Sequence, residues 1–313
     1  MVIRKKLNCV FVLWGAIALM TSFFSCASSP KTGQAVHSVK TFPEGFVKVP
    51  DGIYDGTAPL TPASAVFIPG RIVTIGGLYV CDHEVTQAEY EVYCMYGDMS
   101  PRALRGAGGN YPAYYVNWYD ALVYCNLRSI AEGLQPVYSM AGQTNPVKWA
   151  GIVSKDGKYC GPAVATDAWD AVTFDETADG YRLPTEVEWE YIARNCNRDS
   201  FVYAGSNNAD EVSWNTLNSS ATTHEVNQKK ANGLGMYDMS GNVWEWCWDW
   251  FGPITADTPA AGSAQSAGRT PRGGSWVYGA PCAEVTFRCA YAYYARYDFI
   301  GFRVVRNAEA KQN

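Results

Sequence analysis

The sequence is poor in charged side chains and has no excess of positive charge. Charged residues make up 18% of the 313 residues, hydrophobic residues 48%, and the formal net charge is −5. This balance excludes the overall positive field that is typical of nucleic-acid-binding proteins. The hydrophobic and aromatic content (14% Phe, Trp and Tyr) also excludes a disordered chain, so a folded protein without a nucleic-acid partner is expected.

The motifs that mark common enzyme classes are also missing. There is no GxSxG, P-loop, HExxH or glycine-rich dinucleotide-binding motif. The only histidines are His37, His83 and His224, so a zinc hydrolase or a histidine-based triad would have very few candidates, and we expect His83 at the surface. None of the ten cysteines forms a CxxC pair, so no metal site is predicted; disulfide partners and buried free thiols remain alternatives.

Residues 1–25 are typical of a bacterial lipoprotein signal peptide. A basic cluster at 4–6 precedes an apolar stretch at 9–20, which is too short for a confident transmembrane helix. A small residue then stands before Cys26, although Phe replaces the usual upstream Leu. We therefore predict lipidation of Cys26 and a lipid-anchored protein of the cell envelope, on the outer-membrane surface. Ordinary signal cleavage beside an incidental cysteine is the alternative.

Residues 26–45 read as a polar tether, and residues 46–313 as one domain. Short apolar runs that alternate with turn residues predict α+β structure with few long elements.

Apolar periodicity and capping residues predict helices over 84–96, 118–127 and 185–194. Residues 128–180 are expected to form long loops with some hairpin structure, and 252–271 a surface loop.

Six motifs follow one another along this domain. They are EVTQ (84–87), VNWYDA (116–121), YRLPTE (181–186), GLGMYDMSGNVWEW (233–246), RGGSW (272–276) and GFR (301–303). The series closely resembles the formylglycine-generating (sulfatase-modifying factor) family. The resemblance implies a loop-rich variant of the C-type lectin fold.

The enzymatic members of that family bind copper through two cysteines after the GGS-aromatic motif. Here Tyr278 takes the first position, and the second aligns near Cys282 or Ala283. Soft Cu(I) requires paired sulfur ligands, so we predict no enzyme activity and no cofactor. The alternative is a copper-dependent formylglycine-generating oxidase, or a sulfatase-activating enzyme, that uses Cys282 and Cys289.

The family resemblance also implies that a structural calcium ion could bind near Asn242 and Glu245. Their side-chain oxygens could serve as ligands. In the alternative arrangement Asn242 makes a turn and Glu245 pairs with an arginine, and we do not predict the metal.

The segment from Trp276 to Phe302 is rich in aromatic residues, which account for nine of its 27 positions. Tyrosine gives a large contact area at low entropic cost, as in antibody paratopes. We expect Trp276 and Phe302 in the core and the other rings exposed as a binding surface. In particular, replacing Tyr291, Tyr293 and Tyr294 by Ala is expected to abolish binding and leave stability nearly unchanged.

The lipoprotein signal, the domain and the terminal RGGSW…GFRVVRN segment together resemble treponemal variable proteins diversified by a diversity-generating retroelement. Adenine-directed mutagenesis of such genes cannot yield Trp, Met, Lys, Glu or Gln. Candidate variable, ligand-binding positions within 277–299 are Val277, Tyr278, Gly279, Cys282, Phe287, Cys289, Ala290, Tyr291, Tyr293, Tyr294, Tyr297, Asp298 and Phe299. The flanking motifs are expected to hold the backbone while these side chains differ. The implied partner is a protein or glycan on another cell or phage.

Overall fold

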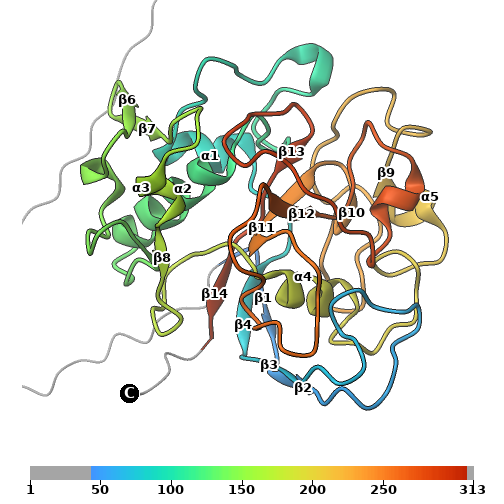
Figure 1. Ribbon diagram of the computed structural model, residues 1–313. Helices are drawn as coiled ribbons and strands as arrows, with labels where there is room; N and C mark the ends of the chain where they lie inside the picture. Colours follow the sequence, from blue (N-terminus) through green and yellow to red (C-terminus); the bar gives the residue numbers. More distant parts are fainter. Residues whose placement is uncertain (1–43, 309–313) are drawn as a thin grey trace, which may run out of the picture. The chain divides into compact units, whose positions relative to one another are not determined.

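Two three-stranded sheets form the centre of the fold. This computed structural model describes residues 44–308; the predicted signal peptide, Cys26 and nearly all of the tether lie outside them. In the first sheet, β4 (Leu78–Cys81) pairs antiparallel with β1 (Phe46–Val49) and with β14 (Val305–Asn307). The two ends of the described chain therefore pair with the same strand (Figure 1).

The second sheet is built on the longest strand, β11 (Trp244–Trp250). This strand pairs antiparallel with β12 (Arg269–Arg272) and parallel with β13 (Ile300–Gly301). The other strands form two-stranded pairs: β2 (Gly52–Tyr54) with β3 (Val73–Ile75), β5 (Tyr138–Ser139) with β8 (Thr173–Phe174), β6 (Val153–Lys155) with β7 (Lys158–Cys160), and β9 (Ser213–Trp214) with β10 (Ser240–Gly241). Short strands and long loops are what the sequence predicted.

Three capping boxes define the helices that matter for the core. Helix α4 (Glu186–Ala193) starts after Thr185, whose side chain and that of Glu188 cap each other's backbone N–H, as predicted. Helix α2 (Trp118–Ala131) starts with the equivalent Asn117–Asp120 pair and runs four residues past its predicted end.

Helix α1 (Gln87–Tyr93) is shorter than the predicted 84–96. Thr86 caps it, and Glu84 is buried before the cap, where its carboxylate accepts hydrogen bonds from Asn242 and from the N–H of Val243. The short helices are α3 (Asp167–Asp170) and α5 (Ala209–Val212), with 3₁₀ turns η1 (Ala103–Arg105), η2 (Pro146–Lys148) and η3 (Ala280–Ala283). None of the helices in residues 44–308 is long and apolar enough to cross a membrane.

The two faces of β11 pack against different helices. Because side chains alternate along a strand, Trp244 and Trp246 join a hydrophobic cluster with α2, whereas Cys247 joins a second cluster with α4. Indole N–H groups fix this packing: Trp118 Nε1 donates to Cys247 O, and Trp246 Nε1 donates to Val116 O, both at 2.9 Å. Residues 44–308 lie within one compact unit.

The structure confirms one of the two predicted loop regions and the other only in part. Residues 128–180 contain long loops and the hairpin β6–β7, as expected. The surface loop predicted over 252–271 ends earlier, because residues 269–272 form β12 and are buried. The guanidinium of Arg269 lies 3.7 Å from the ring centroids of Trp118 and Trp250, so this polar residue belongs to the core.

Candidate ligand-binding surface

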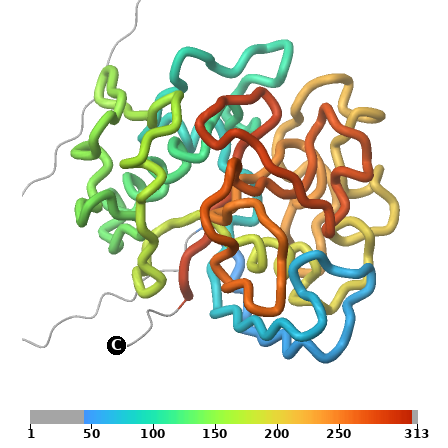
Figure 2. Tube along the Cα trace, in the orientation of Figure 1, coloured from blue at the N-terminus to red at the C-terminus, as the bar shows by residue number. Residues whose placement is uncertain are grey.

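The segment 277–299 is a loop that contains the 3₁₀ turn η3 and is flanked by the buried residues Trp276 and Ile300; Figure 2 shows the path of its chain. Trp276 is 3% exposed and Phe302 is fully buried, which confirms both predicted core positions. The indole Nε1 of Trp276 donates to Asp298 O at 3.0 Å, so the start of the segment is bonded to its end. Ser219 Oγ donates to Trp276 O at 2.9 Å. The loop is thereby closed at its base by Trp276, which is outside the candidate set, and by a main-chain carbonyl that does not depend on the side chain at position 298.

Further along the segment, its main chain is bonded to the rest of the domain. Three backbone N–H groups of the scaffold donate to its carbonyls: Thr216 to Tyr278, Trp118 to Tyr293 and Tyr115 to Tyr297, at 2.8–2.9 Å. Asn117 Nδ2 donates to Tyr294 O at 2.9 Å. Each bond uses a carbonyl that every residue type possesses. The loop path is therefore compatible with many side chains at these positions.

Two buried ion pairs hold the same segment. The Arg296 guanidinium donates to both carboxylate oxygens of Asp120 at 2.8 Å, and Arg288 donates to both oxygens of Glu186. Both arginines lie outside the candidate variable set. Bidentate arginine–carboxylate bonds of this kind fix geometry strongly, so they add to the backbone anchoring.

Five aromatic side chains of the segment pack together, and three of them, Tyr278, Phe287 and Tyr291, contact the buried ring of Trp244. We call all five the aromatic cluster: Tyr278, Phe287, Tyr291, Tyr297 and Phe299. Tyr297 and Phe299 stack with ring centroids 5.1 Å apart, and the hydroxyl of Tyr291 donates to that of Tyr278 at 2.5 Å. Burial, and then this contact with Tyr278, raise the pKa of Tyr291, which therefore stays neutral.

Each member of the aromatic cluster is half-buried. One part of each ring packs on the core while another part reaches solvent. Of the other candidate positions, Val277 and Ala290 are exposed, and Gly279, Cys282, Cys289, Tyr294 and Asp298 are half-buried. Twelve of the thirteen therefore keep contact with solvent, although most are less exposed than the sequence interpretation assumed.

Tyr293 is the exception, and the expectation that its ring is exposed is wrong. It is 6% exposed, because it packs edge-on against Trp250 with centroids 4.9 Å apart. Its hydroxyl donates to Asp170 at 2.9 Å. Asp170 and Trp250 come from distant parts of the chain, so the local sequence contains no signal that would place this tyrosine in the core.

Beside this surface lies a depression of about 480 Å³ that the sequence interpretation missed. We call it the arginine groove; it is lined by Arg102, Leu104, Arg105, Tyr115, Ser220, Ala221 and Asp298. Arg105 lies 3.3 Å from the Asp298 carboxylate and 4.8 Å from the Trp276 ring centroid. Leu104 is 84% exposed. The groove therefore offers positive charge and an apolar side chain next to the candidate segment.

The cysteines within the described residues are free thiols, and six of the eight are buried. Burial raises the pKa of Cys282, and it raises that of Cys289 to about 12. Both thiols therefore hold their protons at neutral pH. Because the thiolate is the nucleophile, both groups are weak nucleophiles at neutral pH.

Asn242 and Glu245 adopt the alternative to the calcium site. Asn242 has a positive φ of 58°, and its Oδ1 accepts a hydrogen bond from His224 N at 2.9 Å. The Glu245 carboxylate accepts bonds from Arg303 at 2.6 and 2.7 Å. The turn and the arginine pairing named above therefore engage both side chains.

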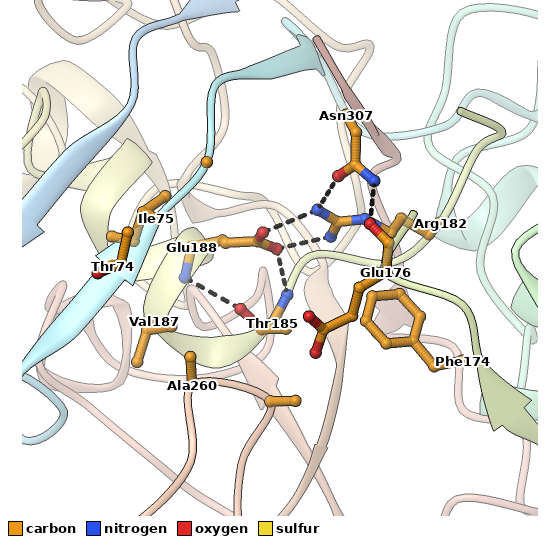
Figure 3. Close-up of a pocket in the computed structure, with 12 residues that line it drawn as sticks. Thr74, Ile75, Phe174, Glu176, Arg182, Thr185, Val187, Glu188, Ala260 and Asn307 are labelled. Atoms are coloured by element: carbon orange, nitrogen blue, oxygen red, sulfur yellow. Dashed lines mark hydrogen bonds and ion pairs between the residues drawn. The ribbon is translucent and has the colours of Figure 1, made fainter. Parts of the chain in front are cut away.

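A second, smaller cavity of about 90 Å³ has a structural explanation (Figure 3). Inside it, Arg182 donates to both oxygens of Glu188, at 2.6 and 2.8 Å, and to Asn307 Oδ1 at 2.8 Å. The polar groups satisfy one another and connect the start of α4 to β14, so we assign them to the fold.

Comparisons with known proteins agree with the geometry. A profile of the sulfatase-modifying factor enzyme 1-like domain matches residues 32–308. The chaperone protein LppX of Paenibacillus barcinonensis is 36% identical over 253 residues, 75% of this chain and 82% of that protein. The formylglycine-generating enzyme of Streptomyces coelicolor is 34% identical over 134 residues, 35% of this chain and 40% of the enzyme.

Among solved structures, the variable protein 1 of Treponema denticola superposes with a TM-score of 0.67 and 29% identity. The superposition covers 84% of this chain and 94% of that one. These matches confirm both resemblances stated above and the predicted loop-rich α+β fold of the C-type lectin kind.

The burial of Tyr293 generates a stability prediction. Tyr293→Ala is expected to lower the free energy of unfolding by about 3 kcal/mol or more, because it leaves a cavity between Tyr119 and Trp250. Tyr293→Phe removes only the bond to Asp170 and should cost about 1 kcal/mol. The matched control is Tyr297→Ala, a half-buried ring, for which a smaller loss is expected. Chemical denaturation gives all three values. Equal midpoints for wild type and Tyr293→Ala would contradict the core assignment.

Proposed function

Because the chain belongs to the family of sulfatase-modifying factor enzyme 1-like domains, we propose that it uses this fold to bind a macromolecular ligand and catalyses no reaction. The single observation that carries the proposal is the aromatic cluster: five half-buried rings, three of which pack on the buried ring of Trp244 while the other two pack on Tyr278 and Tyr291 and on each other. Fixed aromatic side chains of this kind dominate binding energy at protein interfaces.

The chemistry of the segment supports binding over oxidation. The residue at the first copper-ligand position, Tyr278, has its hydroxyl bonded to Tyr291. The two thiols that remain, Cys282 and Cys289, are protonated at neutral pH. A Cu(I) site needs paired sulfur ligands, and the first of the two family positions holds a tyrosine in place of a cysteine.

The arginine groove extends the proposed binding surface. Protein interfaces commonly combine a desolvated aromatic centre with a polar rim. Arginine is enriched among the interface residues that contribute most to the free energy of binding. Arg102 and Arg105 would supply such a rim next to Asp298. Two of the similar proteins, a chaperone protein and a variable protein, have names that describe no reaction, whereas the formylglycine-generating enzyme of Streptomyces coelicolor corresponds to the alternative.

Diversification of this surface by a retroelement is the finer part of the proposal. The segment is held by main-chain carbonyls of candidate positions and by two arginines outside the candidate set, so these bonds do not depend on the candidate side chains. Tyr293 is the one candidate whose core packing opposes free variation.

A lipid anchor would display this surface at the cell envelope. The basic cluster, the apolar stretch and Cys26 support that proposal, together with a polar tether long enough to separate the domain from a membrane. The outer-membrane surface is the location that such display would require.

The binding proposal predicts a specific loss of affinity. Tyr297→Ala and Phe299→Ala are each expected to raise Kd at least tenfold, as removal of a central aromatic contact does. Titration of arrayed surface proteins and glycans from neighbouring bacteria with the purified full chain gives the measurement. Leu217→Ala is the control, because this apolar side chain is 85% exposed and lies outside the cluster.

Two experimental outcomes would overturn the binding proposal. One is unchanged binding in both cluster variants. The other is stoichiometric Cu(I) uptake with aldehyde formation on a cysteine-containing sulfatase peptide, which would favour the oxidase.

Diversification predicts a second observation, in the coding DNA. A nearby imperfect repeat of the sequence that encodes residues 277–299 should differ from it at adenines, and the codon for Tyr293 should be among the least varied in sister loci. Sequencing of the locus decides this. Differences spread evenly over all four bases would rule out the retroelement.

Lipidation predicts the mass of the mature amino terminus. Cys26 should be the first residue and should carry acyl chains, and Cys26→Ser should release the protein from membranes. Mass spectrometry of the membrane fraction measures both. An unmodified Cys26 within an intact terminus would disprove the anchor.

A further inference from the structure

A cysteine, a histidine and a glutamate converge at the junction of β4 and α1, away from the candidate ligand-binding surface. The Nε2 atom of His83 lies 3.4 Å from Glu89 Oε2 and 3.8 Å from Cys81 Sγ. One ligand atom from each residue lies within 4.8 Å of the others. His83 was predicted at the surface, but its side chain is only 16% exposed, because it is enclosed by these neighbours.

The three residues are held from different directions. The carbonyl of Cys81 accepts a bond from Arg303 at 3.0 Å, and its N–H donates to Val304 O, so the end of β4 is fixed. Glu89 Oε2 accepts bonds from the N–H and hydroxyl of Thr86 at 2.9 and 3.0 Å. The side chain of Cys81 is buried, whereas that of Glu89 is 30% exposed, so the site is open on one side.

We propose that Cys81, His83 and Glu89 bind a zinc ion whose fourth position faces solvent. Sulfur, imidazole nitrogen and carboxylate oxygen are the three donor types that protein zinc sites use, and this mixture favours zinc over magnesium or calcium. Tetrahedral bonds of about 2.0–2.3 Å place ligand atoms roughly 3.3–3.6 Å apart. The observed 3.4 Å fits that spacing, and the sulfur at 3.8 Å needs to approach by a few tenths of an ångström.

Asp82 supplies a hydrogen-bond acceptor for the ring nitrogen of His83 that would not bind the metal. Its carboxylate is hydrogen-bonded to Nδ1 of His83, which leaves Nε2 to face Glu89, while Cys81 Sγ lies 3.7 and 3.8 Å from the two ring nitrogens. Metal-binding histidines usually donate their second N–H to a carboxylate in this way, which fixes the ring and strengthens the ligand. The backbone of Asp82 is itself held, because its carbonyl accepts a bond from Tyr237 N at 2.8 Å.

The competing arrangement is an ion pair without metal. Burial opposes a charge on His83, but hydrogen bonds with Asp82, Cys81 and Glu89 outweigh it and raise the pKa to about 12. A proton on Nε2 then occupies the position that zinc would take. Arg128 lies 3.6 Å from the other Glu89 oxygen, Oε1, and so partly neutralises the carboxylate in either state.

The test is metal analysis of the full chain, purified without chelator or immobilised metal and then dialysed. One equivalent of zinc is expected in the wild type and close to none in Cys81→Ser or His83→Gln. Glu89→Gln keeps an oxygen for the Thr86 cap, so its loss of zinc would not reflect an unfolded helix. Asp82→Asn is expected to weaken zinc binding about 10- to 100-fold. Cobalt in place of zinc should give a thiolate charge-transfer band that disappears in Cys81→Ser.

His224→Gln and Cys282→Ser are the matched controls, because they remove the same residue types elsewhere and should keep full zinc content. Circular dichroism of every variant checks that the fold persists. A wild type without stoichiometric zinc, or zinc retained by all three ligand variants, would overturn the proposal and leave the ion pair as the explanation of the cluster.

Discussion

The fold depends on one buried carboxylate, that of Glu245, the second residue of β11. It accepts hydrogen bonds from Nε and Nη2 of Arg303 and from Trp189 Nε1, at 2.6–2.7 Å, and both charged side chains are fully buried. Removing one partner of such a pair typically costs about 3–5 kcal/mol, because it leaves an unpaired charge in the core. Arg303 also donates to Cys81 O and Tyr237 O. The pair therefore joins β11 to β4 and to the GFR motif, and it fixes the point at which the candidate segment ends.

This arrangement separates the groups that hold the loop from those that face solvent. A loop of 23 residues without regular hydrogen bonding would ordinarily depend on its own side chains for its conformation. Here Trp276, Arg288 and Arg296 bond it to the domain, and scaffold N–H groups bond its carbonyls. Changes at the aromatic cluster would then alter the surface and leave the loop path in place. Such a division of roles is the physical requirement for a binding surface whose residues differ between copies.

Local sequence signals were sufficient to predict some elements of the structure, but other features depend on contacts between residues that are distant in the sequence. The capping box at Thr185 predicted α4 closely, because both partners lie within one turn. The family motifs predicted the fold, and Trp276 and Phe302 were placed correctly in the core. Tyr293 was misplaced because its ring is buried by Trp250 and Asp170, which are distant in sequence. The arginine groove was missed for the same reason: the turn near Arg105 meets Asp298 only after the chain has folded.

Buried side-chain hydrogen bonds hold the loops of this domain within residues 44–308. Short strands and long loops bury little backbone in regular ladders, so side chains must satisfy the remaining groups and hold the loops together. Arg269, Arg272 and Arg303 do this from within the core. A zinc ion at Cys81, His83 and Glu89 would extend the same principle, because it would tie α1 to the strand that Arg303 already holds. The carbonyl of Val85, just before α1, accepts a hydrogen bond from Ala113 N, and Tyr115 N, two residues further on, donates to the carbonyl of Tyr297. A zinc ion that fixes α1 would therefore also support the backbone that holds Tyr297.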